Sequence, residues 1–214
     1  MLATTAEKPF SDPNWIFEVK WDGYRIIANK SANEVRLFSR NGNDFSNRYP
    51  AVTTALSKIA GNFILDGEVV VLDKNGIPDF QQLQNSKSIP AERISYMAFD
   101  LLYLQDKSLL NEPVEIRKQM LKDFLPQQPQ ILFSDHFERE GEVLFDEMKK
   151  RGMEGIVAKR KGSKYKPGEK SKEWLKIPVE RTEDFIVGGF QLRENQEYIK
   201  TNPDNWGFVI PFKI

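Results

Sequence analysis

The chain has 214 residues, of which 40% are hydrophobic and 29% are charged, as is typical of an ordinary globular domain. Cysteine is absent and histidine occurs once, which excludes disulfides, thiolate metal sites and multi-histidine metal sites and argues against a histidine-based triad. The 31 basic and 31 acidic residues cancel, so the net charge gives no argument for a nucleic-acid partner. No apolar run is long enough to cross a bilayer, and a bound metal is expected to be a hard cation, Mg²⁺ or Mn²⁺.

The first 13 residues are polar and contain proline, and they predict a loosely held start. Beyond them, period-two alternation and turn residues predict strands, and helical periodicity predicts helices between them. The predicted strands are residues 15–21, 24–29, 34–38, 63–72, 93–104, 131–133, 155–159, 174–177, 184–190 and 206–212, the last placed on the main domain. The predicted helices are residues 49–59, 79–84, 114–125 and 141–151. The irregular alternation favours a mixed α+β, largely antiparallel fold.

The most informative predicted strand runs up to Gly23. Apolar residues alternate there with Glu18, Lys20 and Asp22, so one face of the strand carries a carboxylate, an amine and a second carboxylate. Gly23 then permits a sharp change in backbone direction. A lysine flanked by acids on a strand is most often solvated surface, so its meaning depends on partners elsewhere in the chain.

Basic residues gather in one later stretch. Between Lys149 and Lys176 there are nine Lys and two Arg against three Glu, a local excess of eight positive charges. Such a run is most often a solvated loop. It is also what a surface that follows a phosphate backbone requires.

Five short pieces combine a functional residue type with a strand or a strand end. They are Lys20–Arg25, Ser39–Gly42, Asp66–Glu68, Phe99–Tyr103, and Glu154–Lys159 followed by Trp174–Lys176. In this order they resemble the nucleotidyltransferase motifs of ATP-dependent DNA ligases over about residues 10–190, most like the ligase of bacterial end-joining repair. The resemblance implies a nucleotidyltransferase (ATP-grasp-like ligase) fold, with antiparallel sheets flanked by helices and the nucleotide site between the sheets.

The resemblance also implies a three-step reaction. Lys20 is implied as the catalytic nucleophile, which attacks the α-phosphate of ATP and forms lysyl-AMP. AMP then passes to the 5′-phosphate of a DNA nick, and the 3′-hydroxyl displaces it. An amine attacks only as the neutral base, which nearby cations or burial favour. Lys159 and Lys176 match family positions that contact the α-phosphate, where they would also stabilise charge in the transition state.

Two acidic residues match the positions implied for a metal. Glu154 is the better candidate, because Mg²⁺ typically takes one or two carboxylates and leaves room for phosphate oxygens. Glu68 is implied to lie near the ribose and a second metal position. Asp22 is implied to have a supporting role, and Asp66 and Asp100 are interpreted as structural.

The remaining positions are implied to hold the nucleotide. Phe99 is expected to stack on adenine, Glu18 to lie near the adenine amino edge, and Arg25 and Arg40 to hold the ribose or the nick phosphates. The implied ATP-binding set is Glu18, Lys20, Arg25, Arg40, Glu68, Phe99, Lys159 and Lys176. Outside the motif context Phe99 would be ordinary core, and the acids and lysines would be turn or strand-edge charges. The pair Asp135-His136 is interpreted as a surface or core pair.

Two features depart from the family pattern. Pro178 stands where the family usually carries another lysine, which removes a possible phosphate contact. Residues 1–183 are expected to form the adenylation domain. Residues 184–214 are expected to form a vestige or truncated start of an oligonucleotide-binding barrel, since five strands would use nearly all of them. The family's final basic motif lies in that barrel, so weak self-adenylation and little complete nick sealing are expected.

The implied partners are ATP, Mg²⁺ or Mn²⁺, nicked or broken double-stranded DNA and end-joining repair proteins, with no membrane. A monomer in the bacterial cytoplasm, associated with the nucleoid, is expected. Two alternatives stay open. One is a related lysine nucleotidyltransferase, either an RNA ligase or an mRNA-capping guanylyltransferase. The other is a non-catalytic module that binds nicks.

Overall fold

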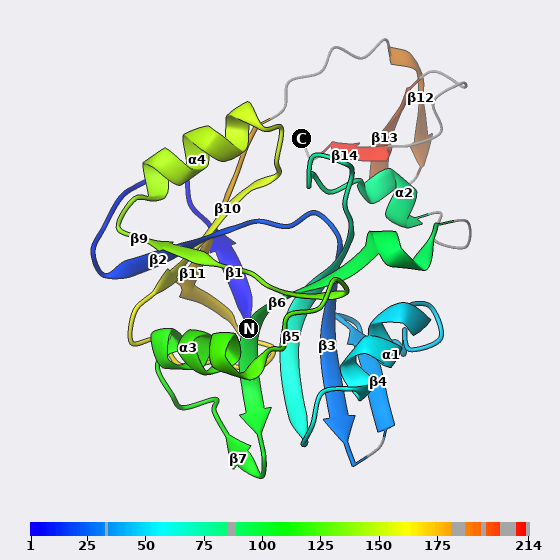
Figure 1. The fold of residues 1–214 in the computed structure, drawn as a ribbon. Helices are drawn as coiled ribbons and strands as arrows, with labels where there is room; N and C mark the ends of the chain where they lie inside the picture. Colours follow the sequence, from blue (N-terminus) through cyan, green and yellow to red (C-terminus); the bar gives the residue numbers. More distant parts are fainter. Residues whose placement is uncertain (33, 85–88, 181–186, 194–195, 202–208, 213–214) are drawn as a thin grey trace. The chain divides into compact units, whose positions relative to one another are not determined.

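A computed structural model describes the chain apart from residues 33, 85–88, 181–186, 194–195, 202–208 and 213–214 (Figure 1). Contacts divide it into two compact units, Met1–Val179 and Glu180–Ile214. Within the described part, no helix is both long and apolar enough to cross a membrane. The first unit holds every residue predicted to form the site, so its two sheets decide where those residues lie.

One sheet of the first unit is built from strands that are far apart in the sequence. Its order is β1 (Leu2–Thr5), β11 (Lys170–Pro178), β10 (Gly155–Arg160), β2 (Trp15–Val19) and β9 (His136–Glu138). β1 pairs with β11 in parallel, and the other neighbours are antiparallel. The predicted loose start is therefore wrong: β1 forms one edge of this sheet, and Met1 is buried in a cluster with Leu102 and Trp174. The local sequence could not reveal this, because the partner strand lies at the far end of the unit.

The second sheet has six strands. Its order is β4 (Glu34–Ser39), β3 (Tyr24–Ser31), β5 (Phe63–Val71), β6 (Ile94–Leu104) and β7 (Lys107–Ser108), and β8 (Ile131–Phe133) pairs in parallel with β6. Arg25 on β3 and Glu68 on β5 are register partners, so their side chains share one face. The short strands β7 and β9 were not predicted.

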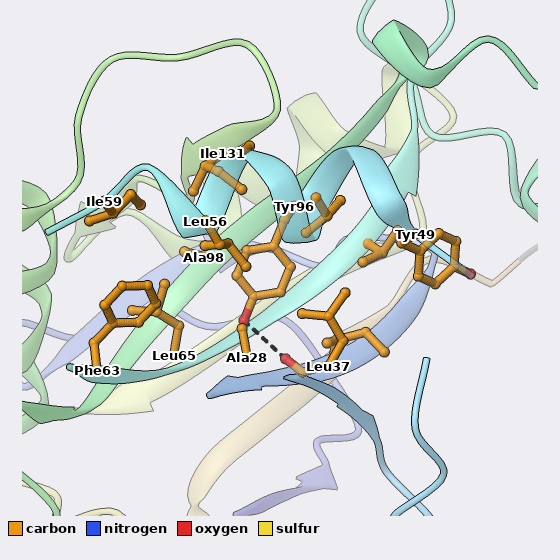
Figure 2. Packing of buried hydrophobic residues seen from close by; sticks show 14 of the residues in the cluster. Ala28, Leu37, Tyr49, Leu56, Ile59, Phe63, Leu65, Tyr96, Ala98 and Ile131 are labelled. Carbon is orange, nitrogen blue, oxygen red and sulfur yellow. Dashed lines mark hydrogen bonds between the residues drawn. The ribbon is translucent and has the colours of Figure 1, made fainter. Parts of the chain in front are cut away.

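Helices cover the sheets sparingly. The described part of the first unit contains α1 (Pro50–Ser57), α2 (Phe80–Gln84), α3 (Val114–Phe124) and α4 (Gly141–Lys150), and a 3₁₀ turn at Ala91–Arg93. α1 begins at a proline, which suits the first helical position, and its Leu56 packs with Phe63 and Leu65 in the largest core cluster (Figure 2). The Tyr96 hydroxyl crosses this core and donates to the Ile26 carbonyl at 3.0 Å (Figure 2). The predicted mixed α+β fold is confirmed.

Two glycines are required where backbones meet closely. A Cβ on Gly23 would lie 2.1 Å from the carbonyl oxygen of Val69 on β5. A Cβ on Gly155 would lie 2.2 Å from the carbonyl oxygen of Ile177 on β11, and Gly155 has a φ of 137°. Gly23 is therefore needed for close packing, because its φ is not among the positive values.

The second unit contains a separate three-stranded antiparallel sheet, β12 (Val187–Arg193), β13 (Gln196–Thr201) and β14 (Val209–Phe212). β12 and β14 overlap the predicted strands at 184–190 and 206–212, of which residues 184–186 and 206–208 lie outside the described residues. β14 pairs with β13 of this sheet, so the prediction that it joins the main domain is wrong. β13 was not predicted.

Candidate active site

A cleft of about 460 Å³ opens within the first unit, lined by residues of both sheets. All nine predicted site residues line it: Glu18, Lys20, Arg25, Arg40, Glu68, Phe99, Glu154, Lys159 and Lys176. Trp21, Asp22, Val157, Phe80, Lys170 and Trp174 also contribute to its walls. The sequence motifs, which lie far apart in the chain, therefore meet in one place.

Strand register explains why the residues of the five-stranded sheet face the same way. Val157 on β10 pairs with Glu18 on one side and with Lys176 on the other. Lys159, two residues further along β10, pairs with Trp174 on β11. Directly paired residues, and residues two apart on one strand, lie on the same face of a sheet. One face of this sheet therefore presents a carboxylate, two amines and an indole to the cleft.

Lys20 lies just beyond the end of β2. Its backbone N–H donates to the carbonyl of Gly155 at 2.9 Å, which fixes the end of β2 against the start of β10. Its ammonium forms an ion pair with the carboxylate of Glu154, the residue before β10. Both side chains are partly exposed to the cleft, 22% for Lys20 and 34% for Glu154. The predicted nucleophile and the better metal candidate are thus direct neighbours.

Glu18, two residues before Lys20, is a buried carboxylate that pairs with two other lysines. The Lys159 Nζ lies 2.8 Å from Oε1 of Glu18, and the Lys118 Nζ lies 3.3 Å from the same oxygen. All three side chains are 2% exposed or less. Lys118 comes from α3, outside the recognised motifs, and sequence reasoning missed it. Lys118 lies inside a helix and outside every motif and turn, so no pattern in the sequence marks it as a site residue.

Lys159 is also held against aromatic rings. Its Nζ lies 4.7 Å from the ring centroid of Phe99 and 4.3 Å from that of Trp174, distances at which a cation is attracted to a ring face. It also donates to the Phe99 carbonyl at 3.3 Å. Lys159 therefore lies with Phe99 and Glu18, the residues expected at the base. Trp174 belongs to the motif Trp174–Lys176, but no role was predicted for it.

The six-stranded sheet contributes a second buried charge network. Arg25 donates from Nε and Nη2 to the two carboxylate oxygens of Asp66, at 3.0 and 2.6 Å, and Tyr165 donates to Asp66 Oδ2 at 2.7 Å. Burial opposes the charge on Arg25, but Asp66 outweighs it and raises the Arg25 pKa. Nearby, the fully buried Asp100 accepts two bonds from Arg117, at 2.7 and 2.9 Å. Both aspartates hold the scaffold together, in keeping with their structural interpretation.

Glu68 is the most perturbed acid of the cleft. Burial raises the pKa of Glu68 to about 8, although Arg25 and Lys20 act in the opposite direction. A carboxyl group with a raised pKa, in a cleft with a lysine, is characteristic of functional sites. No group of three or more metal-ligating side chains occurs among the described residues. One or two carboxylates with phosphate oxygens suffice for Mg²⁺, so Glu154 and Glu68 fit such an ion.

The remaining predicted residues lie at more open positions. Arg40 and Lys176 line the cleft and are exposed, so they are placed to meet an anion that enters from solvent. Asp135 is also exposed and lies 3.9 Å from Nδ1 of His136 on β9. Burial lowers the pKa of His136. The acid–histidine pair thus joins an exposed aspartate to a partly buried histidine.

Comparison with known proteins assigns the family. The model of the ATP dependent DNA ligase domain matches residues 1–177, which is most of the chain. The chain belongs to the ATP-dependent DNA ligase family. The DNA ligase-like protein LigB of the Bacillus subtilis SPbeta prophage is 31% identical over 209 residues, which cover 95% of this chain and 75% of that protein.

Some longer relatives of this chain are named as repair proteins. The multifunctional non-homologous end joining DNA repair protein LigD of Mycobacterium tuberculosis is 36% identical over 181 residues, 84% of this chain but 24% of LigD. The chain thus spans about a quarter of the length of that relative. A mycobacterial DNA ligase D solved in complex with ATP and MES superposes with a TM-score of 0.73 at 30% identity, covering 92% of this chain and 66% of that one. This ligase domain therefore shares its fold with a protein that binds ATP.

Proposed function

We propose that this domain transfers adenylate from ATP to DNA through Lys20. The neutral amine of Lys20 attacks the α-phosphorus of ATP, a P–N bond forms, and the bond from that phosphorus to the bridging oxygen breaks, so pyrophosphate leaves with the electron pair. Glu154, already in contact with the Lys20 ammonium, is placed to accept its proton. The observation that carries the proposal is the convergence of all nine predicted residues on one cleft.

The cleft walls suit the parts of the nucleotide. Phe99 and Trp174 offer aromatic faces for the base, Glu18 offers a carboxylate for its polar edge, and Arg25 lies near the expected ribose. Lys159 offers an ammonium for the α-phosphate, its expected contact. Lys176 and Arg40 would meet the phosphates. A Mg²⁺ ion held by Glu154 and Glu68 would neutralise phosphate charge when bound.

The second half of the reaction uses DNA. We infer that the 5′-phosphate of a nick attacks the adenylated Lys20 and restores the free amine, and that the 3′-hydroxyl then closes the strand and releases AMP. Relationship to ligases supports this acceptor. An end-joining repair pathway, with its partner proteins, is supported by likeness to LigD. Residues 1–183 are proposed as the adenylation domain, and residues 184–214 as a vestige or the start of an oligonucleotide-binding barrel.

Labelling with α-³²P-ATP and Mg²⁺ tests the first step. We expect weak label on the protein that is stable in alkali and released by acid, as a P–N bond requires, and none in the Lys20→Ala variant. The Lys149→Ala variant, which removes an exposed lysine of α4, should label as the wild type does. Label that survives Lys20→Ala would show that another residue is the nucleophile. GTP in place of ATP tests the capping alternative, and nicked RNA in place of nicked DNA tests RNA ligation.

A further inference from the structure

The buried ion cluster beneath the cleft contains one more cation than anion. Lys118 and Lys159 both approach the same oxygen of Glu18, at 3.3 and 2.8 Å, and all three side chains are almost fully buried. Lys118 also donates to the carbonyl of Ser134, and its Nζ lies 4.4 Å from the ring centroid of Phe133. Lys159 lines the cleft, whereas Lys118 is not among the residues that line it. Only one of the two lysines can therefore turn toward a ligand.

This arrangement poses an electrostatic problem for nucleotide binding. If Lys159 turns to a bound nucleotide, Glu18 loses its nearer counter-ion. A buried carboxylate without a partner is strongly unfavourable, so a Glu18–Lys159 pair on its own would resist the exchange. The second lysine removes this obstacle, because it stays on the carboxylate after Lys159 has moved. The extra positive charge also favours an anionic ligand close by.

We propose that Lys118 is a positioning residue for nucleotide binding: it holds the Glu18 carboxylate so that the Lys159 ammonium is free to bind an acceptor atom of the nucleotide. The inference rests on the proposed function, since ATP is the ligand. Lys118 acts through Glu18 and Lys159 and does not itself touch the nucleotide. Its position on α3 also couples that helix to the floor of the cleft.

The protonation of Lys118 gives the role a pH signature. Burial lowers the pKa of Lys118 to about 8, although Glu18 acts in the opposite direction. The charged groups that act on Lys118 or on which it acts come from four strands: Glu18 on β2, Lys159 on β10, Asp100 on β6 and His136 on β9. As pH rises through about 8 in the free protein, Lys118 loses its proton and Glu18 keeps only Lys159. Above about pH 8, Lys118 therefore no longer provides Glu18 with a second positive charge.

The first measurement is ATP affinity by calorimetry, made in proteins that carry Lys20→Ala so that no label forms. The second is the second-order rate of labelling, made in proteins that keep Lys20. Lys118→Met should weaken ATP binding by at least about 30-fold, as expected when a buried charge loses its partner. Lys122→Met, which changes an exposed lysine one turn later on α3, should change neither quantity. Near-UV circular dichroism and melting curves check that each variant is folded.

Two further variants separate positioning from general support of the fold. Adding Glu18→Gln to Lys118→Met should recover part of the lost affinity, because no buried carboxylate then needs a partner. The Lys118→Arg variant keeps its charge at alkaline pH, so its labelling rate relative to wild type should rise between pH 7 and pH 9, a range of about one unit either side of the Lys118 pKa. Unchanged affinity in Lys118→Met, or an additive loss in the double variant, would overturn the inference. ATP binding without label on Lys20 would instead overturn the proposed function alone.

Discussion

The Tyr165–Asp66 contact allows the clearest stability prediction, because the chain carries a matched control. Tyr165 is 5% exposed and donates to Oδ2 of Asp66 at 2.7 Å, and Asp66 is fully buried. Tyr165→Phe removes this charge-assisted bond and leaves the ring in place. A hydrogen bond to a charged group contributes about 1.5–3 kcal/mol. We therefore expect the free energy of unfolding to fall by about 2 kcal/mol.

The control is Tyr103→Phe. The Tyr103 hydroxyl donates to Asp106 at 3.2 Å, but this contact is exposed, so its loss should change the free energy of unfolding by less than about 0.5 kcal/mol. Urea denaturation followed by far-UV circular dichroism measures both variants. Equal stability of the two would refute the reasoning, because it would mean that burial adds nothing to this bond. Because Asp66 also holds Arg25, we expect Tyr165→Phe to weaken ATP binding modestly as well.

Two more predictions use Glu68 and Gly155. Burial raises the pKa of Glu68 to about 8, so the folded protein holds the proton of this carboxyl group more tightly than the unfolded chain does. The protonated Glu68 therefore contributes to stability at low pH, and this contribution is lost as pH rises from about 4.5 through about 8. Glu68→Gln should therefore gain stability relative to wild type in urea denaturation as pH is raised across this range, whereas the exposed Glu7→Gln should show no such trend. Gly155→Ala should cost several kcal/mol, on the order of 3, because of its φ of 137° and a Cβ 2.2 Å from the Ile177 carbonyl oxygen. Gly162 has a φ of 78°, and an added Cβ there would meet no atom within 4 Å outside its chain neighbours, so Gly162→Ala should lower the free energy of unfolding by about 1 kcal/mol. Equal melting temperatures for the Gly155→Ala and Gly162→Ala variants would contradict this.

Local patterns predicted most of the first unit, since alternation and turn residues are recorded in neighbouring positions. The predicted strands at 63–72 and 93–104 differ by one residue at one end from β5 and β6. What failed depends on distant pairing. Leu2–Thr5 forms a strand only because β11 lies beside it, and His136–Glu138 forms one because β2 does. Neither segment is long enough to show the alternating pattern that predicts a strand.

The site residues divide in the same way, into those that a local motif predicts and those that only the packing of distant elements reveals. Lys20 and Glu154 were found because each is embedded in a motif, and register then brings them into contact. Lys118 could not be found in this way. In the sequence it is one of two lysines on an amphipathic helix, where charge usually means solvent exposure. Only the packing of α3 against β6 shows that it is completely buried, whereas Lys122, on the same helix, is exposed.

Several lysines line the cleft, but three of its cations already have anionic partners. Lys20 is paired with Glu154, Lys159 with Glu18, and Arg25 with Asp66. Nucleotide binding at such a site exchanges one anion for another, and its cost depends on what happens to the carboxylate that is left behind. Glu154 is partly exposed, so water or a cation can compensate it. Glu18 is buried and needs a second protein cation, which is the physical reason for a lysine as deep as Lys118.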